Sequence, residues 1–182
     1  TQVELYVAYK DYKWMMDFTE KMIENVAKVL HGSPEVTVGD HIIDFSSPWP
    51  RIPMFEAIEQ FAGHNLYGKN LAELKNIATE LHIEMKESYG VAKIIDEIFG
   101  TYVEPKLIQP TFITDYPVEI SPLTKKHRNK EGLVERFECI CNGKEIANAY
   151  TELNDPVDQR ERLEAQASLR AGGDHEAMTI DE

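Results

Sequence analysis

The sequence predicts an α+β fold, in which strand patterns near both ends of the chain are separated by a mainly helical stretch. Three observations carry this prediction: alternating apolar and polar residues at positions 3–9, apolar residues spaced by three and four positions over 11–31 and 53–106, and renewed strand patterns over 107–153. A period of two is typical of half-buried strands, and a spacing of three and four is typical of amphipathic helices. Strands and helices that occur in separate runs favour an α+β architecture.

The first two expected elements are a strand and a helix. In VELYVAY, the side chains of Val3, Leu5 and Val7 would share one face of a strand. A helix is expected from Asp11, whose carboxylate can cap its first turn, to Gly32, which suits a left-handed C-terminal cap. Its apolar stripe is expected to consist of Trp14, Met15, Phe18, Met22, Val26 and Leu30.

A hairpin and several helices should follow. EVTVGDHIIDF reads as two short strands that turn at residues 39 and 40. A helical stretch is then expected over about 53–106, with Pro53 at a first helical position, Gly63 as a stop and Asn70 as a cap. The stripe of the middle helix should contain Leu71, Leu74, Ile77 and Leu81.

Strands return in LIQPTFITDY and in ERFECICNGKEIANAYTEL. The dipeptide of Asn142 and Gly143 is a strong signal for a two-residue hairpin turn. A last helix is expected with Asp155 as its cap and Pro156 at its first position, ending at residues 172 and 173 before an acidic tail.

Composition limits the classes of function. The chain has 182 residues with 42% hydrophobic and 28% charged residues, which fits one core or a core with a small appended module. No apolar run approaches the roughly 18–20 residues that span a bilayer, so no membrane segment is expected. The net charge of -13, from 19 Lys and Arg against 32 Asp and Glu, argues against a protein that coats nucleic acid. The densest basic segment, LTKKHRNK, reads first as a solvated loop and second as a local RNA contact.

Common cofactor motifs are missing. The sequence contains neither a GxxxxGK[ST] phosphate loop nor a GxGxxG fingerprint. Cys139 and Cys141 alternate on one strand, where neighbouring same-face positions rarely close a disulfide, so reduced cytoplasmic thiols are expected. With the nearest histidines at His127 and His175, the spacing does not favour a zinc site.

The stretch EIANAYTELNDP is unusually polar for a strand. Regular alternation would put Asn148, Tyr150 and Glu152 on one face and Glu145 on the other. A carboxylate beside an amide and a phenol suits a ligand with an ammonium group, whereas two neighbouring carboxylates suit a divalent metal that also holds phosphates. A strand edge exposed to water is the alternative. A second carboxylate and phenol on one strand face, in VELYVAY, favours a ligand site.

These segments resemble class II lysyl-tRNA synthetases. QPTFITDYPVEISPLTKKH, followed by RFECICNGKEIANAYTELNDPVDQR, is similar to the stretch that leads into their third signature motif, and VELYVAYKDY is similar to the second strand of their motif two. The resemblance runs through nearly the whole chain. It implies an antiparallel six-stranded class II aminoacyl-tRNA synthetase catalytic sheet with flanking helices. Residues 1–64 and 107–182 would be a partial catalytic domain, and residues 65–106 a small helical insertion.

The resemblance also implies an activity and a set of site residues. The reaction would be ATP-dependent activation of lysine to lysyl-adenylate, followed by transfer to tRNA(Lys). Five positions match those that contact the substrate lysine: Glu4, Tyr6, Asn148, Tyr150 and Glu152. Glu145 and Glu152 match the acids that bind ATP together with Mg²⁺, and no further catalytic side chain is assigned. Because a regular strand separates Glu145 from Glu152, a bulge is expected near residues 147–149.

The family's motif one, its two ATP-binding arginines and its anticodon-binding barrel have no match in this chain. We therefore expect the central fragment of a larger cytoplasmic enzyme, inactive alone, whose whole form is a homodimer; the oligomeric state of the fragment is left open. Two alternatives remain. One is a lysine ligase that modifies a translation elongation factor, although such ligases generally lack the helical insertion. The other is a non-catalytic binding module, against which the two acids Glu145 and Glu152 argue.

Overall fold

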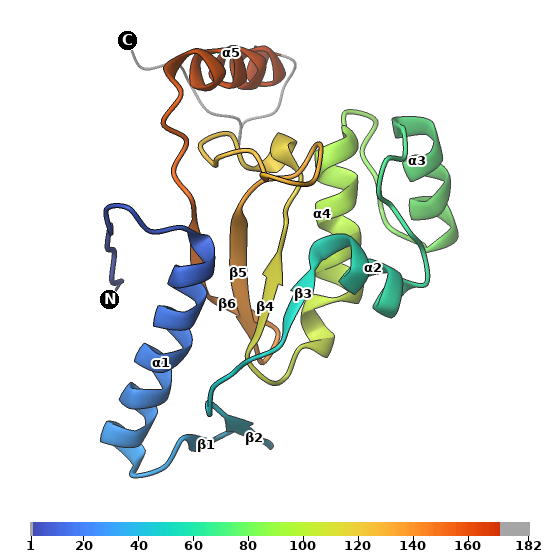
Figure 1. Cartoon of the computed structure of the whole chain (residues 1–182). Helices are drawn as coiled ribbons and strands as arrows, with labels where there is room; N and C mark the ends of the chain where they lie inside the picture. Colours follow the sequence, from blue (N-terminus) through green and yellow to red (C-terminus); the bar gives the residue numbers. More distant parts are fainter. Residues whose placement is uncertain (1, 172–182) are drawn as a thin grey trace.

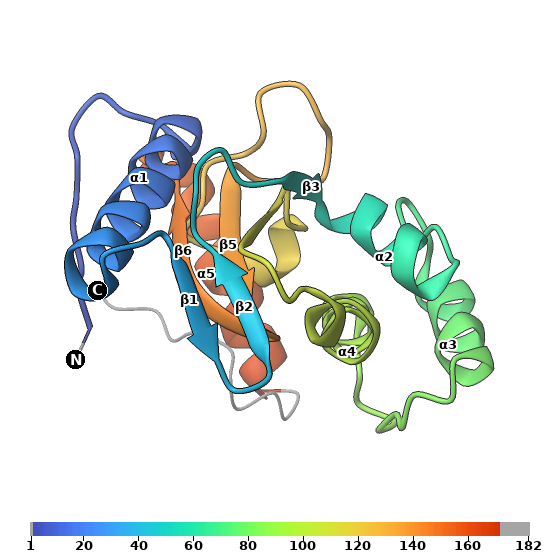
Figure 2. The ribbon, with the colours of Figure 1, turned by 90° about the horizontal axis from the view of Figure 1, so that it is seen from below.

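The computed structural model describes residues 2–171, the last four of them by their backbone alone. It confirms the α+β prediction: helices lie on both sides of a four-stranded sheet, and a separate two-stranded hairpin follows the first helix (Figures 1 and 2). Figure 1 shows α1 on one side of the sheet and α2 to α4 on the other.

The main sheet has the strand order β3 (Arg51–Pro53), β4 (Thr111–Thr114), β5 (Arg136–Cys141) and β6 (Lys144–Tyr150). β4, β5 and β6 are antiparallel neighbours, whereas β3 is parallel to β4. This differs from the six antiparallel strands that the resemblance implies. The parallel pair arises because a long helical connection returns the chain to the sheet in its original direction.

Helix α1 (Tyr12–His31) has the expected caps but a different buried face. Asp11 accepts a hydrogen bond from the backbone N–H of Trp14 at 3.2 Å, and Gly32 ends the helix with a φ of 74°. The expected stripe is wrong at its C-terminal end, where Leu30 is 71% exposed. Tyr12 and Met16 are buried instead, because α1 contacts β5 and β6 along the face that carries these residues.

The strand expected in VELYVAY is not present. Residues 2–10 are exposed, and Val3, for example, is 76% exposed. Within the described part of the chain, no strand pairs with this segment. Because a strand needs backbone hydrogen bonds to a neighbour, an alternating sequence alone does not produce one.

The first hairpin is confirmed. β1 (Glu35–Val38) and β2 (His41–Asp44) are antiparallel, and Val38 pairs with His41 across residues 39 and 40. The side chain of Gln109 binds the hairpin through two bonds. Its oxygen accepts from the N–H of Asp44, and its nitrogen donates to the carbonyl of Ile42, each at 2.9 Å.

The helical stretch contains α2 (Met54–Ala62), α3 (Leu71–Glu80), α4 (Val91–Tyr102) and the 3-10 turn η1 (Glu104–Lys106). Gly63 and Asn70 act as expected, since Gly63 ends α2 with a φ of 76° and Asn70 forms a capping box. Pro53 instead ends β3 and caps α2.

Helix α4 shares one hydrophobic core with the sheet. Its buried residues Ile94, Ile98 and Phe99 belong to the same cluster as Ile113 of β4 and Ile140 of β5. The division at residues 65 and 106 remains a prediction, and this packing favours a smaller separable unit than the whole stretch.

The second hairpin turns at Asn142 and Gly143, as expected. Their φ values of 52° and 68° are both positive, as a type I′ turn requires. The 3-10 turn η2 (Val118–Ile120) precedes β5, and α5 (Pro156–Ala171) follows β6. Asp155 caps α5 by accepting from the N–H of Val157 at 3.0 Å. The predicted stop at residues 172 and 173 and the acidic tail lie outside the described residues.

Two cores cover the two faces of the sheet. The larger contains α2, α3, α4 and the side chains on their face of the sheet, and the smaller joins α1 to Phe112, Phe137 and Cys139. Both cysteines are buried free thiols, as expected. No helix in the described part of the chain combines the length and the apolar character that crossing a membrane would require.

Candidate functional site

The expected irregularity in β6 occurs one residue earlier than predicted. Cys139 pairs with Ala147, whereas the next residue, Ile140, pairs with Glu145, so Ile146 is an extra residue in β6. Directly paired residues of antiparallel strands point to the same face. The bulge therefore moves Glu145 to the face of the sheet that carries Ile140 and Asn148.

This face, which we call the acidic face, carries Glu138, Glu145, Asn148 and Tyr150. Glu138 pairs with Asn148 in the β5–β6 register, and Arg136 pairs with Tyr150. The opposite side chains of these strands, including Ala147 and Ala149, pack toward α1. The small alanines on that side let β6 lie close to the helix, whereas Glu145, Asn148 and Tyr150 lie on the acidic face.

Arg136 is the central cation of the acidic face, and the sequence interpretation missed it. Its Nε donates to Oδ1 of Asn148 at 3.2 Å, and its guanidinium forms an ion pair with Glu138. The guanidinium also stacks on the aromatic ring of Tyr116, and its central carbon lies 4.7 Å from the ring centroid. The signal was available in ERFECIC, because alternation puts Arg136 and Glu138 on one face of a strand.

The N-terminal segment contributes the second pair of polar residues. The phenol of Tyr6 donates to the carboxylate of Glu4 at 2.8 Å. This bond raises the pKa of Tyr6, as do the charge of Glu4 and, more weakly, Tyr150 and Glu152. Burial raises the pKa of Tyr150, and the charges of Glu152 and Glu4 raise it further. The structure thus places both phenols near both carboxylates, although Tyr6 is 82% exposed.

The carboxylate of Glu145 acts on Glu138, whereas the sequence predicted Glu152 as its partner. Burial is the main cause of the raised pKa of Glu138, which Arg136 lowers and the charge of Glu145 raises further. Among the residues described by the structure, no group of three or more His, Cys, Asp or Glu side chains could hold a metal ion. The pair of Glu138 and Glu145 would therefore need phosphate or water oxygens to complete the coordination of a divalent cation.

The contacts of the basic segment LTKKHRNK favour a structural loop over an RNA contact. Arg128 binds both carboxylate oxygens of Glu135, at 2.5 and 2.9 Å, and also Asp11 at 3.0 Å. Lys130 contacts Asp115 at 2.7 Å, and Lys126 contacts Asp158 at 3.1 Å. These cations neutralise carboxylates of the chain, which leaves less positive charge available to phosphates.

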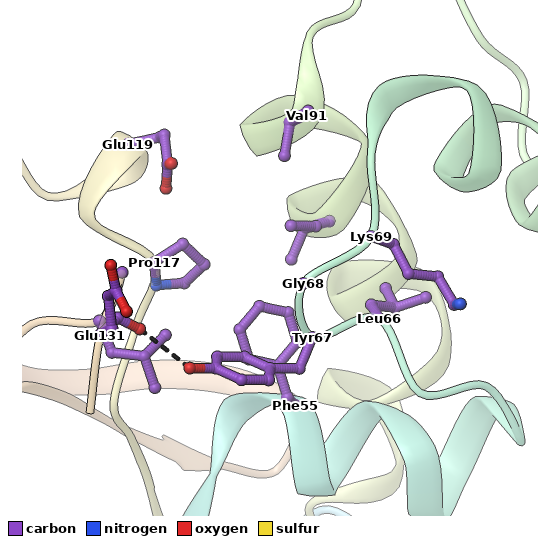
Figure 3. A pocket seen from close by; sticks show the side chains of 12 residues that line it. Phe55, Leu66, Tyr67, Gly68, Lys69, Val91, Pro117, Glu119 and Glu131 are labelled. Atoms are coloured by element: carbon purple, nitrogen blue, oxygen red, sulfur yellow. Dashed lines mark hydrogen bonds between the residues drawn. The ribbon is translucent and has the colours of Figure 1, made fainter. Parts of the chain in front are cut away.

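A separate pocket of about 290 Å³ lies between α4 and the segments around Pro117 and Glu131 (Figure 3). The side chain of Tyr67 lines this pocket, and its hydroxyl donates to the carbonyl of Glu131 at 3.0 Å. None of the predicted site residues lines it. The site expected from the sequence is instead the open acidic face.

Comparison with known proteins matches the whole chain to one family. The family model described as tRNA synthetases class II (D, K and N) matches residues 1–182. A lysine–tRNA ligase of Porphyromonas gingivalis is 55% identical over 181 residues, which are 100% of this chain and 31% of that protein. The lysine–tRNA ligases of Christiangramia forsetii and Azobacteroides pseudotrichonymphae are each 53% identical, with 32% and 36% of their lengths covered. The chain spans about a third of the length of these curated relatives.

Proposed function

Because this chain belongs to the class II tRNA synthetases (D, K and N), we propose that it forms the lysine-binding part of a lysine–tRNA ligase. The whole protein would use ATP to convert lysine to lysyl-adenylate, and would then transfer the lysyl group to tRNA(Lys). We also propose that it acts in the cytoplasm as a homodimer. The names of the relatives favour this function over an elongation-factor ligase and over a non-catalytic module.

One observation carries the proposal: two carboxylates both raise the pKa values of two phenols, and the four residues come from distant parts of the chain. They are Glu4 and Tyr6 from the N-terminal segment and Tyr150 and Glu152 from the C-terminal strand region. An alkylammonium group has three donors and no acceptor, so it needs oxygen acceptors when it leaves water. Ionised carboxylates make the stronger, charge-assisted bonds. Glu4 and Glu152 would bind the lysine ammonium, and the phenols would orient it.

For Mg²⁺, we propose Glu138 as the partner of Glu145. Two carboxylates on one face repel each other, and the charge of Glu145 indeed raises the pKa of Glu138. A divalent cation between them would remove this repulsion, and carboxylate oxygens are ligands that Mg²⁺ prefers. When bound, Mg²⁺ would offset the negative charge of the ATP phosphates. The pairing of Glu145 with Glu152 that the resemblance implies remains the alternative.

In the proposed reaction, the carboxylate oxygen of lysine attacks the α-phosphate of ATP and pyrophosphate leaves with the electrons of the broken P–O bond. The residues of this chain would act before that step. They would hold the ammonium group and fix the direction of the amino acid, so that its carboxylate lies near the phosphate. Such positioning lowers the entropic part of the barrier.

A chimeric enzyme tests this function. The chain would replace the matched third of the Porphyromonas gingivalis lysine–tRNA ligase, and lysine-dependent exchange of pyrophosphate into ATP would be measured. We expect exchange by the chimera and its loss in Glu152→Gln. The control Glu87→Gln changes an exposed carboxylate outside the site and should leave exchange intact. An unimpaired Glu152→Gln enzyme would contradict the proposed role of Glu152 in binding the lysine ammonium group.

A further inference from the structure

The guanidinium of Arg136 donates to four acceptors within the protein. A guanidinium group has five N–H donors. Nε donates to Asn148, one Nη donates to the carbonyl of Ile120 at 3.2 Å and to Oγ of Ser121 at 2.9 Å, and the other binds Glu138. Its side chain is only 16% exposed although it lies on the acidic face.

These contacts fix the guanidinium from several directions. The acceptors come from β5 itself, from β6 and from the segment at 120–121, and the ring of Tyr116 packs against the group. An arginine that recognises a ligand needs two neighbouring free donors for a bidentate contact. Among the residues that the structure describes, only one donor of Arg136 has no acceptor, so its contacts suit the holding of other side chains better than the binding of a substrate.

The contact with Asn148 determines which end of its carboxamide a ligand meets. Arginine has no acceptor, so the Asn148 atom 3.2 Å from Nε must be the carbonyl oxygen. The amide NH₂ is then left for a ligand on the exposed side of β6. An NH₂ group donates hydrogen bonds, so it fits an oxygen acceptor and does not fit an ammonium group.

We propose that Arg136 is a positioning residue of the lysine site, which holds the Asn148 carboxamide so that its NH₂ group donates to an oxygen atom of the bound amino acid. This inference rests on the proposed function. It distinguishes two kinds of contact that the proposed lysine site would make with its ligand. Glu4 and Glu152 accept from the ammonium group, whereas Asn148 donates to an oxygen at the other end of the ligand.

A double-mutant cycle in the chimeric enzyme tests the coupling. Arg136→Met should raise the lysine KM by about 10- to 100-fold at saturating ATP and Mg²⁺, the range expected when a well-oriented contact to a charged group is lost. In an Asn148→Ala background the same substitution should change the lysine KM by less than about twofold. Equal fold-changes in both backgrounds would overturn the inference, because Arg136 would then act independently of Asn148.

A second variant leaves the arginine in place and tests the donor directly. Asn148→Asp keeps an acceptor for Arg136 but replaces the NH₂ group by a carboxylate oxygen. We expect the Tm of the 182-residue chain to be unchanged or higher, because the pair with Arg136 becomes charge-assisted. The lysine KM should nevertheless rise at least as much as in Asn148→Ala. A lysine KM equal to that of the unsubstituted enzyme would overturn the inference.

Arg51→Met is the matched control. Arg51 also stacks on a buried ring, 5.9 Å from the centroid of Phe112, and pairs with Asp17 and Glu20, but it lies away from the acidic face. Its loss should leave the lysine KM within about twofold of the unsubstituted value, because Arg51 pairs with Phe112 on the α1 side of the sheet and distant substitutions act independently. An increase equal to that of Arg136→Met would overturn the positioning role. A chimera without lysine-dependent exchange would contradict the proposed function and this inference with it, whereas an active chimera with additive losses would contradict only the inference.

Discussion

Glu145 lies on the same face of the sheet as Glu138, although regular alternation along β6 would put it on the opposite face from Asn148. The cause is the extra residue Ile146, which shifts the pairing from Cys139–Ala147 to Ile140–Glu145. Bulges of this kind redirect side chains next to functional sites. Here the shift brings two carboxylates of neighbouring strands together.

The first prediction concerns these two carboxylates. In the chimeric enzyme, Glu138→Gln should raise the Mg²⁺ concentration needed for half-maximal exchange by about tenfold or more, since even indirect partners of a metal site cost 10- to 100-fold in affinity. Titration of the exchange rate with Mg²⁺ measures this. A Mg²⁺ requirement that is unchanged in Glu138→Gln but raised in Glu145→Gln would favour the alternative pairing of Glu145 with Glu152.

The second prediction concerns the N-terminal phenol. Tyr6→Phe removes the hydroxyl that donates to Glu4 at 2.8 Å, so the carboxylate loses a contact that orients it. We expect the lysine KM to rise by about two- to tenfold with kcat little changed, the size expected for one exposed hydrogen bond that orients a ligand-binding carboxylate. Tyr9→Phe is the control because Tyr9 is fully exposed. Equal effects of the two substitutions would argue against a role of Tyr6 in the site.

Local signals in the sequence predicted most of the secondary structure. The cap at Asp11, the stop at Gly32 and the capping box at Asn70 depend on contacts within four residues, so they can be read directly from neighbouring letters. The turn at residues 142 and 143 is equally local. The strand over residues 3–9 failed because it depends on a partner strand, which no short pattern specifies.

The site was harder to predict than the fold, for the same reason. Alternation correctly put Asn148 and Tyr150 on one face, but it placed Glu145 on the wrong face, because a bulge depends on the register with β5. The position of Glu152 on that face stays a prediction. The resemblance assigned roles only to residues at the family's ligand-binding positions. Arg136 and Glu138 were missed since both lie on a strand that reads as core, and only the paired register brings them next to β6.

The third prediction tests whether α4 belongs to the same cooperative unit as the sheet. Phe99→Ala should lower the free energy of unfolding by about 3–5 kcal/mol, the usual cost of deleting a buried aromatic ring. Phe99 is 2% exposed and contacts Tyr116 edge to face. Because Trp49 packs on Phe112 in the other core, tryptophan fluorescence reports on the sheet while far-UV circular dichroism reports on the helices.

We expect both signals of the Phe99→Ala chain to shift together to lower denaturant concentration. Leu71→Ala, on the exposed side of α3, should change stability by less than about 1 kcal/mol. A fluorescence transition that stays at its original midpoint would mean that the helices unfold independently. In that case the separable module would extend to α4, as the division at residue 106 implies.

The fourth prediction is a pH dependence of stability. Lys28, Ser47 and the Ser47 backbone N–H all bind the Glu24 carboxylate and lower its pKa from an ordinary 4.5 to about 2. A carboxylate whose pKa is lower in the folded state stabilises the fold above its ordinary pKa, and this contribution is lost as the pH falls through the folded value. The chain should therefore be more stable than Glu24→Gln near pH 6, with the difference disappearing between pH 4.5 and about 2.

Urea unfolding at several pH values measures this difference, and Glu84→Gln, an exposed acid on a loop, serves as the control. A stability difference between the unsubstituted chain and Glu24→Gln that stays constant from pH 6 to pH 2 would contradict the assignment of the low pKa to these contacts.

The last prediction concerns the 182-residue chain by itself. Adenylate formation needs cations that offset the charge developing at the α-phosphate, and removal of one such preorganised donor commonly costs about 10²–10³ in rate. The two ATP-binding arginines of the family have no matching position in this chain, and Arg136 donates to four acceptors within the protein, which leaves it unable to make a bidentate contact with a phosphate. We therefore expect no lysine-dependent exchange of pyrophosphate into ATP by the isolated chain under conditions in which the chimera is active. Exchange by the isolated chain within about tenfold of the chimera would show that its own residues supply the missing cations, and the assignment of Arg136 as a positioning residue would then be wrong.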